Sequence, residues 1–150
     1  MSSLPSHLLN AVASPVIVAD SVLEDACVHL EYLGYRIERG SVKDWLFASH
    51  VTHLSWWLRD LAGGLLFRKA YSASESGRAK REALVDLANR MNTNGIWVRC
   101  FIDDRHDLAL EAWYPSLYER RSFGHFLMAL DSEVRGHLRR WPEEVEALLT

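Results

Sequence analysis

Apolar residues recur at intervals of three or four positions in three stretches of the chain. This spacing is typical of helices that cover a core with one side. The stretches span about residues 21 to 33, 77 to 92 and 119 to 141. Gly34 follows the first stretch, and Pro142 marks the end of the third or opens a short terminal turn. The pattern therefore predicts three helices.

Elsewhere, apolar and polar residues alternate, and aromatic or β-branched residues are frequent, which is typical of strands. Ala62-Gly63-Gly64 is a tight-turn signal between two such stretches. The first three strands should form an antiparallel meander, because the connections between them are short. The expected strands lie within residues 44–51, 53–61, 65–73, 96–103 and 107–114.

The predicted order of elements is α-β-β-β-α-β-β-α, which favours an antiparallel sheet covered by helices on one face. The expected fold class is α+β with two layers. At 150 residues the chain has the length of a single domain, and we assign residues 20–150 to it. Residues 1–19 contain Pro5 and Pro15, which interrupt a long helix, and are interpreted as an N-terminal arm.

Hydrophobic residues make up 49% of the chain and charged residues 25%, which is close to the average of globular proteins and excludes a disordered or fibrous class. The net charge of −3 provides no global attraction to nucleic acid or to an anionic membrane. Cys27 and Cys100 lie outside any CxxC pattern and are expected to be reduced core residues. Without a signal peptide, a long apolar run or a phosphate-binding motif, a cytoplasmic protein with no membrane contact, no metal and no cofactor is expected.

Residues 102–107 read IDDRHD, which can form either an acidic chemical site or a hairpin turn. The segment lies between two predicted strands, where Asp is favoured because it tolerates turn dihedral angles and bonds nearby backbone groups. A calcium loop would need a glycine at its bend and a bidentate Glu at its end. We therefore interpret Asp103, Asp104 and Asp107 as turn residues. A small hydrolase or metal enzyme that uses His106 with Asp103 and Asp107 remains one hypothesis for the function, ranked below the two that follow.

Adjacent apolar residues within the predicted strands place apolar side chains on both faces of the sheet, because consecutive strand residues point in opposite directions. Trp56 and Trp57 are the clearest case. A face that no helix covers would expose an apolar patch, which usually marks an interface. A local curl of the sheet, with the N-terminal arm over the tryptophans, is the alternative. The residues expected at a partner or dimer interface are Trp56, Trp57, Leu66, Phe67, Trp97 and Trp113.

The last predicted helix carries the densest set of basic residues in the chain. Arginines near a helix C-terminus are also favoured by the helix dipole, and Asp131 dilutes their charge. A groove for nucleic acid would combine more basic residues with exposed aromatic residues. Contact with nucleic acid through Arg120, Arg121, Arg135 and Arg139 is therefore the second hypothesis for the function.

The segment LANRMNTNGIWVRCFIDDRHDLALEAWYP resembles the central signature of YbjN-type proteins, a bacterial family of proposed sensory transduction regulators. It reads as a helix that ends in an Asn-rich turn, then a strand, an acidic turn and a second strand. LEYLGYRIE is similar to the start of those domains, and the resemblance covers about residues 20 to 140. It implies the fold of type III secretion chaperones and a homodimer that offers sheet and helix surfaces to protein partners. It also implies no cofactor and no established catalytic residues.

These observations favour a non-catalytic, protein-binding module that acts as a homodimer, as a chaperone-like protein or a regulatory adaptor. A bound partner segment would lie extended across an apolar strip, or it would add a strand at an open sheet edge. The alternative is a regulator that contacts nucleic acid, or a protein bound to nucleic acid, through the arginines of the last helix.

Overall fold

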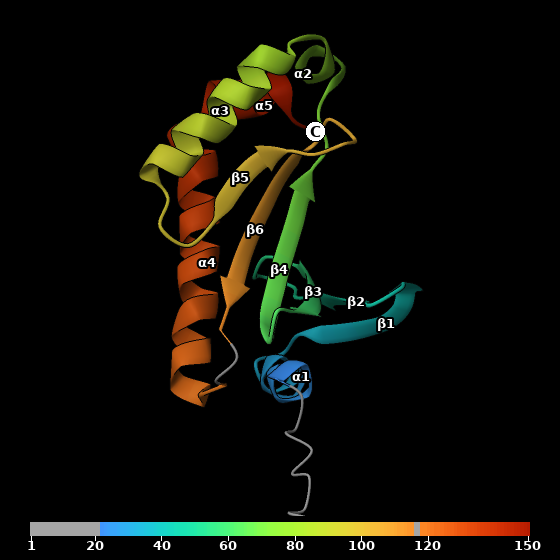
Figure 1. Ribbon diagram of the computed structural model, residues 1–150. Helices are drawn as coiled ribbons and strands as arrows, with labels where there is room; N and C mark the ends of the chain where they lie inside the picture. Colours follow the sequence, from blue (N-terminus) through green and yellow to red (C-terminus); the bar gives the residue numbers. More distant parts are fainter. Residues whose placement is uncertain (1–21, 116–117) are drawn as a thin grey trace, which may run out of the picture.

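A computed structural model describes residues 22–115 and 118–150 (Figure 1). The strands are β1 (Arg36–Val42), β2 (Trp45–Ser49), β3 (Trp56–Leu61), β4 (Gly64–Tyr71), β5 (Arg99–Ile102) and β6 (Leu108–Tyr114). The helices are α1 (Val22–Tyr32), α2 (Glu75–Ala79), α3 (Arg81–Asn94), α4 (Arg120–Arg140) and α5 (Pro142–Leu148). Within these residues the strands form one antiparallel sheet in the order β1-β2-β3-β4-β6-β5. The predicted α+β fold class is confirmed, and the arm predicted for residues 1–19 lies outside the described residues.

The sheet contains one strand that the hydrophobic pattern does not predict. β1 has the sequence RIERGSV, in which charged residues interrupt any alternation of apolar positions. It lies at the edge of the sheet, where charged residues are tolerated because one side of the strand faces solvent. The register with β2 shifts between Arg39 and Val42, and Gly40 between them has a φ of 88°, which glycine adopts without a steric cost. A bulged edge strand of this kind shows no regular alternation of apolar and polar residues, so the sequence pattern does not indicate it.

The helix predicted at 77–92 is divided into α2 and α3 at Lys80, whose φ of −111° and ψ of 56° are not helical. The Oγ of Ser74 caps α2 by accepting a hydrogen bond of 3.0 Å from the N–H of Gly77. Gly77 allows the C-terminal helix to approach, because a Cβ there would collide with the carbonyl oxygen of Leu148. The last predicted helix corresponds to α4, and the short α5 follows it.

The hydrophobic core lies between the helices and one face of the sheet. Trp56 and Leu58 of β3, and Leu65 and Phe67 of β4, are almost fully buried and belong to one cluster with apolar side chains of the helices. Helical members of this cluster include Ala26, Leu30, Leu84, Leu87, Met91, Phe123, Phe126, Leu127 and Leu130. The buried residues of β3 and β4 in this cluster alternate along their strands and so point to the same face of the sheet. The described helices therefore lie on that one face, as expected.

Figure 1 shows α4 running along one side of the sheet beside β6, with α1 at the lower end of the sheet. α2, α3 and α5 gather at the upper end, close to the C-terminus. This arrangement leaves two surfaces that no described element covers. One is the face of the sheet opposite the core, and the other is a groove between α1 and α4.

Candidate functional site

The first candidate surface is the face of the sheet opposite the core, which we call the open face. Strand pairing places Phe47, Trp57, Arg68, Glu111 and Arg99 in one row across five strands. Because these residues alternate with buried residues of their own strands, their side chains point away from the helices. The larger side chains of the open face include Trp45, Phe47, Trp57, Arg59, Leu66, Arg68, Arg99, Phe101, Glu111 and Trp113.

Aromatic side chains on the open face pack against one another and against arginine. The ring centres of Phe47 and Trp57 are 4.8 Å apart, and the guanidinium of Arg59 lies 4.7 Å from the ring centre of Trp45. Trp113 is 48% exposed, and its indole N–H donates a hydrogen bond of 3.0 Å to a backbone carbonyl. Rings that are held in place and partly exposed are common anchors of protein interfaces.

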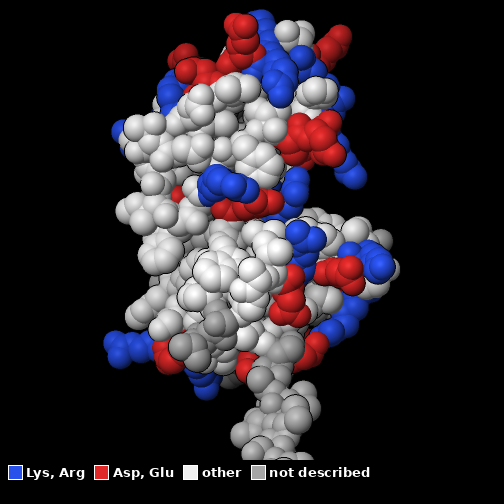
Figure 2. All heavy atoms as spheres, in the orientation of Figure 1, with Lys and Arg blue, Asp and Glu red and all other residues white. Residues whose placement is uncertain are grey.

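Carboxylates balance most of the positive charge on this face. Arg68 lies 3.3 Å from Asp103 and 3.4 Å from Glu111, and Arg99 lies 2.7 Å from the other oxygen of Glu111. In Figure 2, uncharged side chains occupy much of the surface, a group of basic and acidic side chains lies side by side near its middle, and other charged ones gather at the upper end, along the right-hand edge and at the lower left. A surface with paired charges fits an apolar protein partner better than a phosphate backbone, which requires an excess of positive charge.

The residues expected at an interface occupy different layers of the structure. Trp56 and Phe67 are 2% and 0% exposed and face the helices, so in this fold they are core residues that a partner cannot reach. Trp57 and Trp113 lie on the open face. Leu66 points to the same face but is only 7% exposed, because its neighbours on the sheet cover it. The open face therefore contains three of the six expected residues.

Trp97 precedes β5 and lines a pocket together with Leu66, Arg99 and Trp113 of the open face. It is half-exposed, and its ring meets that of Phe126 edge-on with centres 6.0 Å apart. Sequence reasoning missed Trp45, Phe47 and Phe101 as members of the open face. The alternation of large and small residues in WLFAS, the sequence of β2, was a signal that could have identified the first two.

The edges of the sheet are less suited to the addition of a partner strand. Along β5, the side chain of Asn92 occupies the position of a neighbouring strand. Its Oδ1 accepts a hydrogen bond of 2.7 Å from the N–H of Cys100, and its Nδ2 donates one of 2.8 Å to the carbonyl of the same residue. At the other edge, β1 is charged and bulged, and Arg39 is held by two hydrogen bonds to Glu24. Such features protect sheet edges from further pairing.

The IDDRHD segment forms the hairpin turn between β5 and β6, as the turn interpretation predicts. The Oδ1 of Asp103 accepts hydrogen bonds from the N–H groups of Arg105 and Asp107, at 2.9 and 3.0 Å. His106 has a φ of 65°, and the carboxylate of Asp107 accepts a hydrogen bond from the N–H of Ala73 at 2.9 Å. Turn geometry thus accounts for Asp103, while the carboxylate of Asp107 joins the turn to the segment that follows β4. Within residues 22–115 and 118–150, no group of three or more His, Cys, Asp or Glu is arranged to hold a metal.

The arginines of α4 do not form one basic patch. The guanidinium of Arg120 stacks on Tyr32 at 4.8 Å, and Arg135 is paired with Asp131 at 2.8 Å. Arg121 and Arg139 are exposed but lie 18 residues apart, which is about 27 Å along a helix. The helix therefore presents separated positive charges rather than a continuous track.

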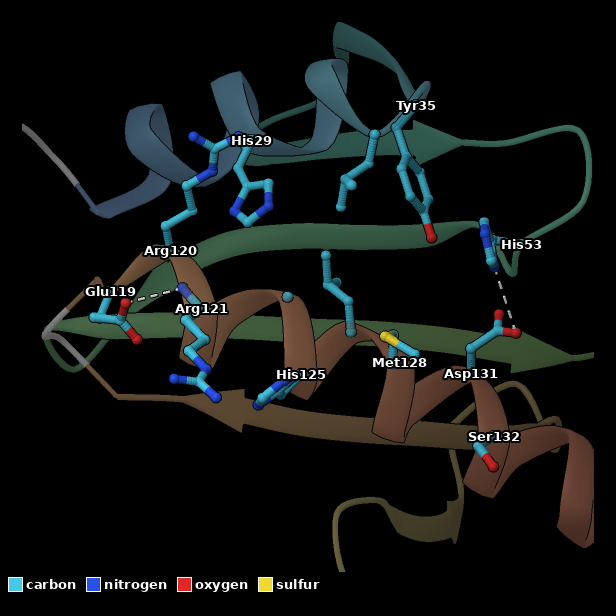
Figure 3. A pocket seen from close by; sticks show the side chains of 13 residues that line it. His29, Tyr35, His53, Glu119, Arg120, Arg121, His125, Met128, Asp131 and Ser132 are labelled. Carbon is cyan, nitrogen blue, oxygen red and sulfur yellow. Dashed lines mark hydrogen bonds and ion pairs between the residues drawn. The ribbon is translucent and has the colours of Figure 1, made fainter.

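The second candidate surface is the space between α1 and α4, which has a volume of about 880 Å³ and which we call the α1–α4 groove. Figure 3 shows His29 and Tyr35 on the α1 side and Met128 and Asp131 on the α4 side, with both helices running beside the space. Leu33 and Met128, which line it, are 41% and 71% exposed. The middle of the groove is therefore apolar and accessible.

A polar contact joins α1 to the segment before α4 at one end of the groove. The Nδ1 of His29 lies 2.9 Å from the hydroxyl of Tyr118, which precedes α4. Burial, and then the nearby charge of Arg120, lowers the pKa of His29 below its usual value. A neutral imidazole is therefore favoured here, because a second positive charge beside Arg120 would be only partly solvated.

At the other end of the groove, Asp131 ties α4 to the loop before β3. One oxygen accepts a hydrogen bond of 2.7 Å from the N–H of Leu54, and the other accepts one of 2.8 Å from Arg135. Burial raises the pKa of Asp131, but these hydrogen bonds and the charge of Arg135 outweigh it, so the pKa lies below its usual value. Burial also raises the pKa of Tyr35 to about 12. The ends of the groove are thus fixed by polar contacts.

Among known proteins, the chain is similar to a solved structure but not to a family model or a curated sequence. Its structure matches the crystal structure of YbjN from E. coli with a TM-score of 0.66 and 13% sequence identity, over 85% of this chain and 95% of YbjN. This chain has the YbjN fold.

The resemblance inferred from the helix, Asn-rich turn and acidic hairpin is therefore confirmed for the fold. YbjN itself is described as a proposed transcription regulator, and that description belongs to YbjN. In the part of the chain that the structure describes, no helix is long and apolar enough to cross a membrane.

Proposed function

We propose that this protein is a non-catalytic, protein-binding module that acts as a homodimer through its open face. The observation that supports this proposal most directly is that the helices of residues 22–115 and 118–150 cover only one face of the sheet. The other face presents Trp113, which is 48% exposed, beside the partly exposed rings of Trp45, Phe47 and Trp57. Exposed aromatic side chains that alternate with paired charges, as in the Arg68–Glu111 pair, are typical of protein interfaces.

A second copy of the chain is a suitable occupant of this face. In a dimer with two-fold symmetry the same patch is buried on both copies. The arginines of the patch already lie beside carboxylates, as in the Arg99–Glu111 pair at 2.7 Å. Burial of the patch would therefore leave few charges without a partner, which would otherwise oppose association. Surface left outside the dimer contact would bind other proteins.

The YbjN fold supports a regulatory role for such a dimer, since YbjN is described as a proposed transcription regulator. A regulatory adaptor in the cytoplasm, or a chaperone-like protein, would use the dimer to hold a segment of another protein. The alternative is a regulator that contacts nucleic acid through α4. Its arginines at positions 121 and 139 are exposed, but their separation makes this the weaker proposal.

The proposal is tested by the mass of the full-length protein in solution, measured by sedimentation equilibrium over a wide concentration range. A dimer is expected. Trp57→Ala and Trp113→Ala should each weaken it by about thirtyfold, as expected for an aromatic anchor at the centre of an interface. Met128→Ala, which changes a more exposed apolar residue on α4, is the control and should leave the dimer unchanged. A wild-type monomer, or a dimer that tolerates both tryptophan substitutions, would contradict the proposal.

A further inference from the structure

We infer that the α1–α4 groove is the docking site for the chain's own N-terminal segment, residues 4–18. This assignment is independent of the homodimer proposed above, which uses the opposite face of the sheet. It rests on the apolar surface in the groove, on the composition of the segment and on the place where the segment joins the described structure.

The groove offers apolar surface that the described residues leave uncovered. Leu33 and Met128 line it and are 41% and 71% exposed. Tyr32, which is 74% exposed, extends this surface at the rim, where Arg120 stacks on its ring. His29 at one end and Asp131 at the other already have polar partners within the fold, while Arg121 and His125 also line the groove. An occupant therefore needs to supply apolar side chains to the middle of the groove.

The N-terminal segment has the composition that such a groove requires. Among the first 20 residues, Asp20 is the only charged side chain if His7 is neutral. Apolar side chains recur throughout the segment, at Leu4, Leu8, Leu9, Val12, Val16, Ile17 and Val18. A segment with this many apolar residues and almost no charge gains free energy when it leaves water, and it lacks the high charge that keeps a chain disordered.

The segment joins the structure at a position from which it reaches the groove. It leads directly into α1 at Val22, and the seven residues from there to His29 correspond to about 10 Å of helix. Along α4 and its N-cap, the groove extends from Glu119 to Ser132, which is about 20 Å. Residues 4–18 can span about 50 Å when extended. A reversal of the chain before α1 would therefore lay the segment along the whole groove.

Attachment to α1 also favours this segment over an occupant from another molecule. A short flexible connection gives an attached segment an effective concentration in the millimolar range. A foreign peptide of similar affinity would have to reach that concentration before it displaced the segment.

Hydrogen–deuterium exchange of the full-length protein, followed by mass spectrometry, tests the assignment. Amides of residues 7–18 should exchange at least tenfold more slowly than in an unstructured chain. Met128→Asp should raise their exchange about tenfold, because it places a charge in the groove. Val51→Asp is the matched control, since Val51 is 95% exposed and does not line the groove. It should leave the exchange unchanged.

The reciprocal variant carries Leu9→Asp together with Val12→Asp. Release of the segment should then speed exchange in residues 29–33 and 125–131, the two walls of the groove. Met128 is 71% exposed, so Met128→Asp should fold, and Met128→Gln is a milder version of the same test. Exchange of residues 7–18 at the unstructured rate in the wild type, or protection unaffected by the groove variants, would overturn the assignment. Protection that rises with protein concentration would overturn it as well, because the segment would then dock on a second copy.

Discussion

The carboxylate of Glu133 in α4 accepts a hydrogen bond of 3.0 Å from the backbone N–H of Trp97. The same carboxylate accepts hydrogen bonds from the N–H groups of Ile96 and Val98, at 3.1 and 3.0 Å. One side chain thus satisfies three consecutive donors and holds the approach to β5 against α4. This contact also fixes the backbone from which the half-exposed indole of Trp97 projects.

Glu133→Ala is expected to lower the free energy of unfolding by about 2 kcal/mol, because it leaves three N–H groups, of which that of Val98 is partly buried, without this acceptor. Glu133→Gln retains one carbonyl oxygen and should cost less. Urea denaturation of both variants measures the difference. Equal stability of the wild type and Glu133→Ala would show that water replaces the carboxylate at no cost.

Asn92→Ala is expected to reduce stability by about 1 kcal/mol and to expose the backbone of Cys100 at the edge of β5. An exposed edge pairs with other chains, so light scattering on heating should increase as well. Asn89→Ala, on an exposed position of the same helix, is the control. The same scattering in both variants would argue against a protective role for Asn92.

Stability should fall as the pH decreases from neutrality through about 6.5, the usual pKa of histidine. Burial, and then Arg120, lowers the pKa of His29 in the folded protein, and burial likewise lowers the pKa of His137. Between the lowered value and the usual one, the unfolded chain binds protons that the folded protein does not, so stability rises with pH. Thermal unfolding across this range should show a smaller slope in His29→Gln. An unchanged slope would contradict the role of His29, and His125→Gln, on an exposed position of α4, serves as control.

Asp103→Ala is expected to lower the free energy of unfolding by about 1–2 kcal/mol, because the N–H groups of Arg105 and Asp107 lose their acceptor. Asp104→Ala, at an exposed position of the same turn, should have little effect. Elemental analysis of the purified protein should find no stoichiometric metal in the wild type. A metal that is present in the wild type and lost in Asp103→Ala would instead support the hypothesis of a metal enzyme.

Binding of a labelled DNA duplex, measured by fluorescence anisotropy at physiological salt, should be weaker than a dissociation constant of about 10⁻⁴ M. The physical reason is that the exposed charges of Arg121 and Arg139 are too far apart to follow a phosphate backbone together. Tighter binding that falls steeply with salt and is lost in Arg121→Ala with Arg139→Ala would support the nucleic-acid alternative.

Trp56 and Trp57 show how much the alternation of residues in a strand indicates about the face that each side chain occupies. Alternation predicts correctly that the two indoles point to opposite faces. It does not indicate which one meets the helices, because a strand has two equivalent phases until its register with neighbours is known. Pairing of Trp57 with Phe47 and Arg68 resolves this choice. The same pairing explains why Phe47 was missed as a member of the open face.

By itself, the sequence determined the helices α1 and α4, most of the strands, the acidic turn and the fold class. These features depend on residues a few positions apart, through periodicity, capping and turn geometry. Only the tertiary structure decided that Trp56 and Phe67 are core residues, that Asn92 closes the edge of β5 and that a groove separates α1 from α4. Each of these depends on how segments distant in the chain pack, as Leu54 does with Asp131 across 77 positions. Local pattern carries no information about such contacts, because many arrangements of the same elements satisfy it equally well.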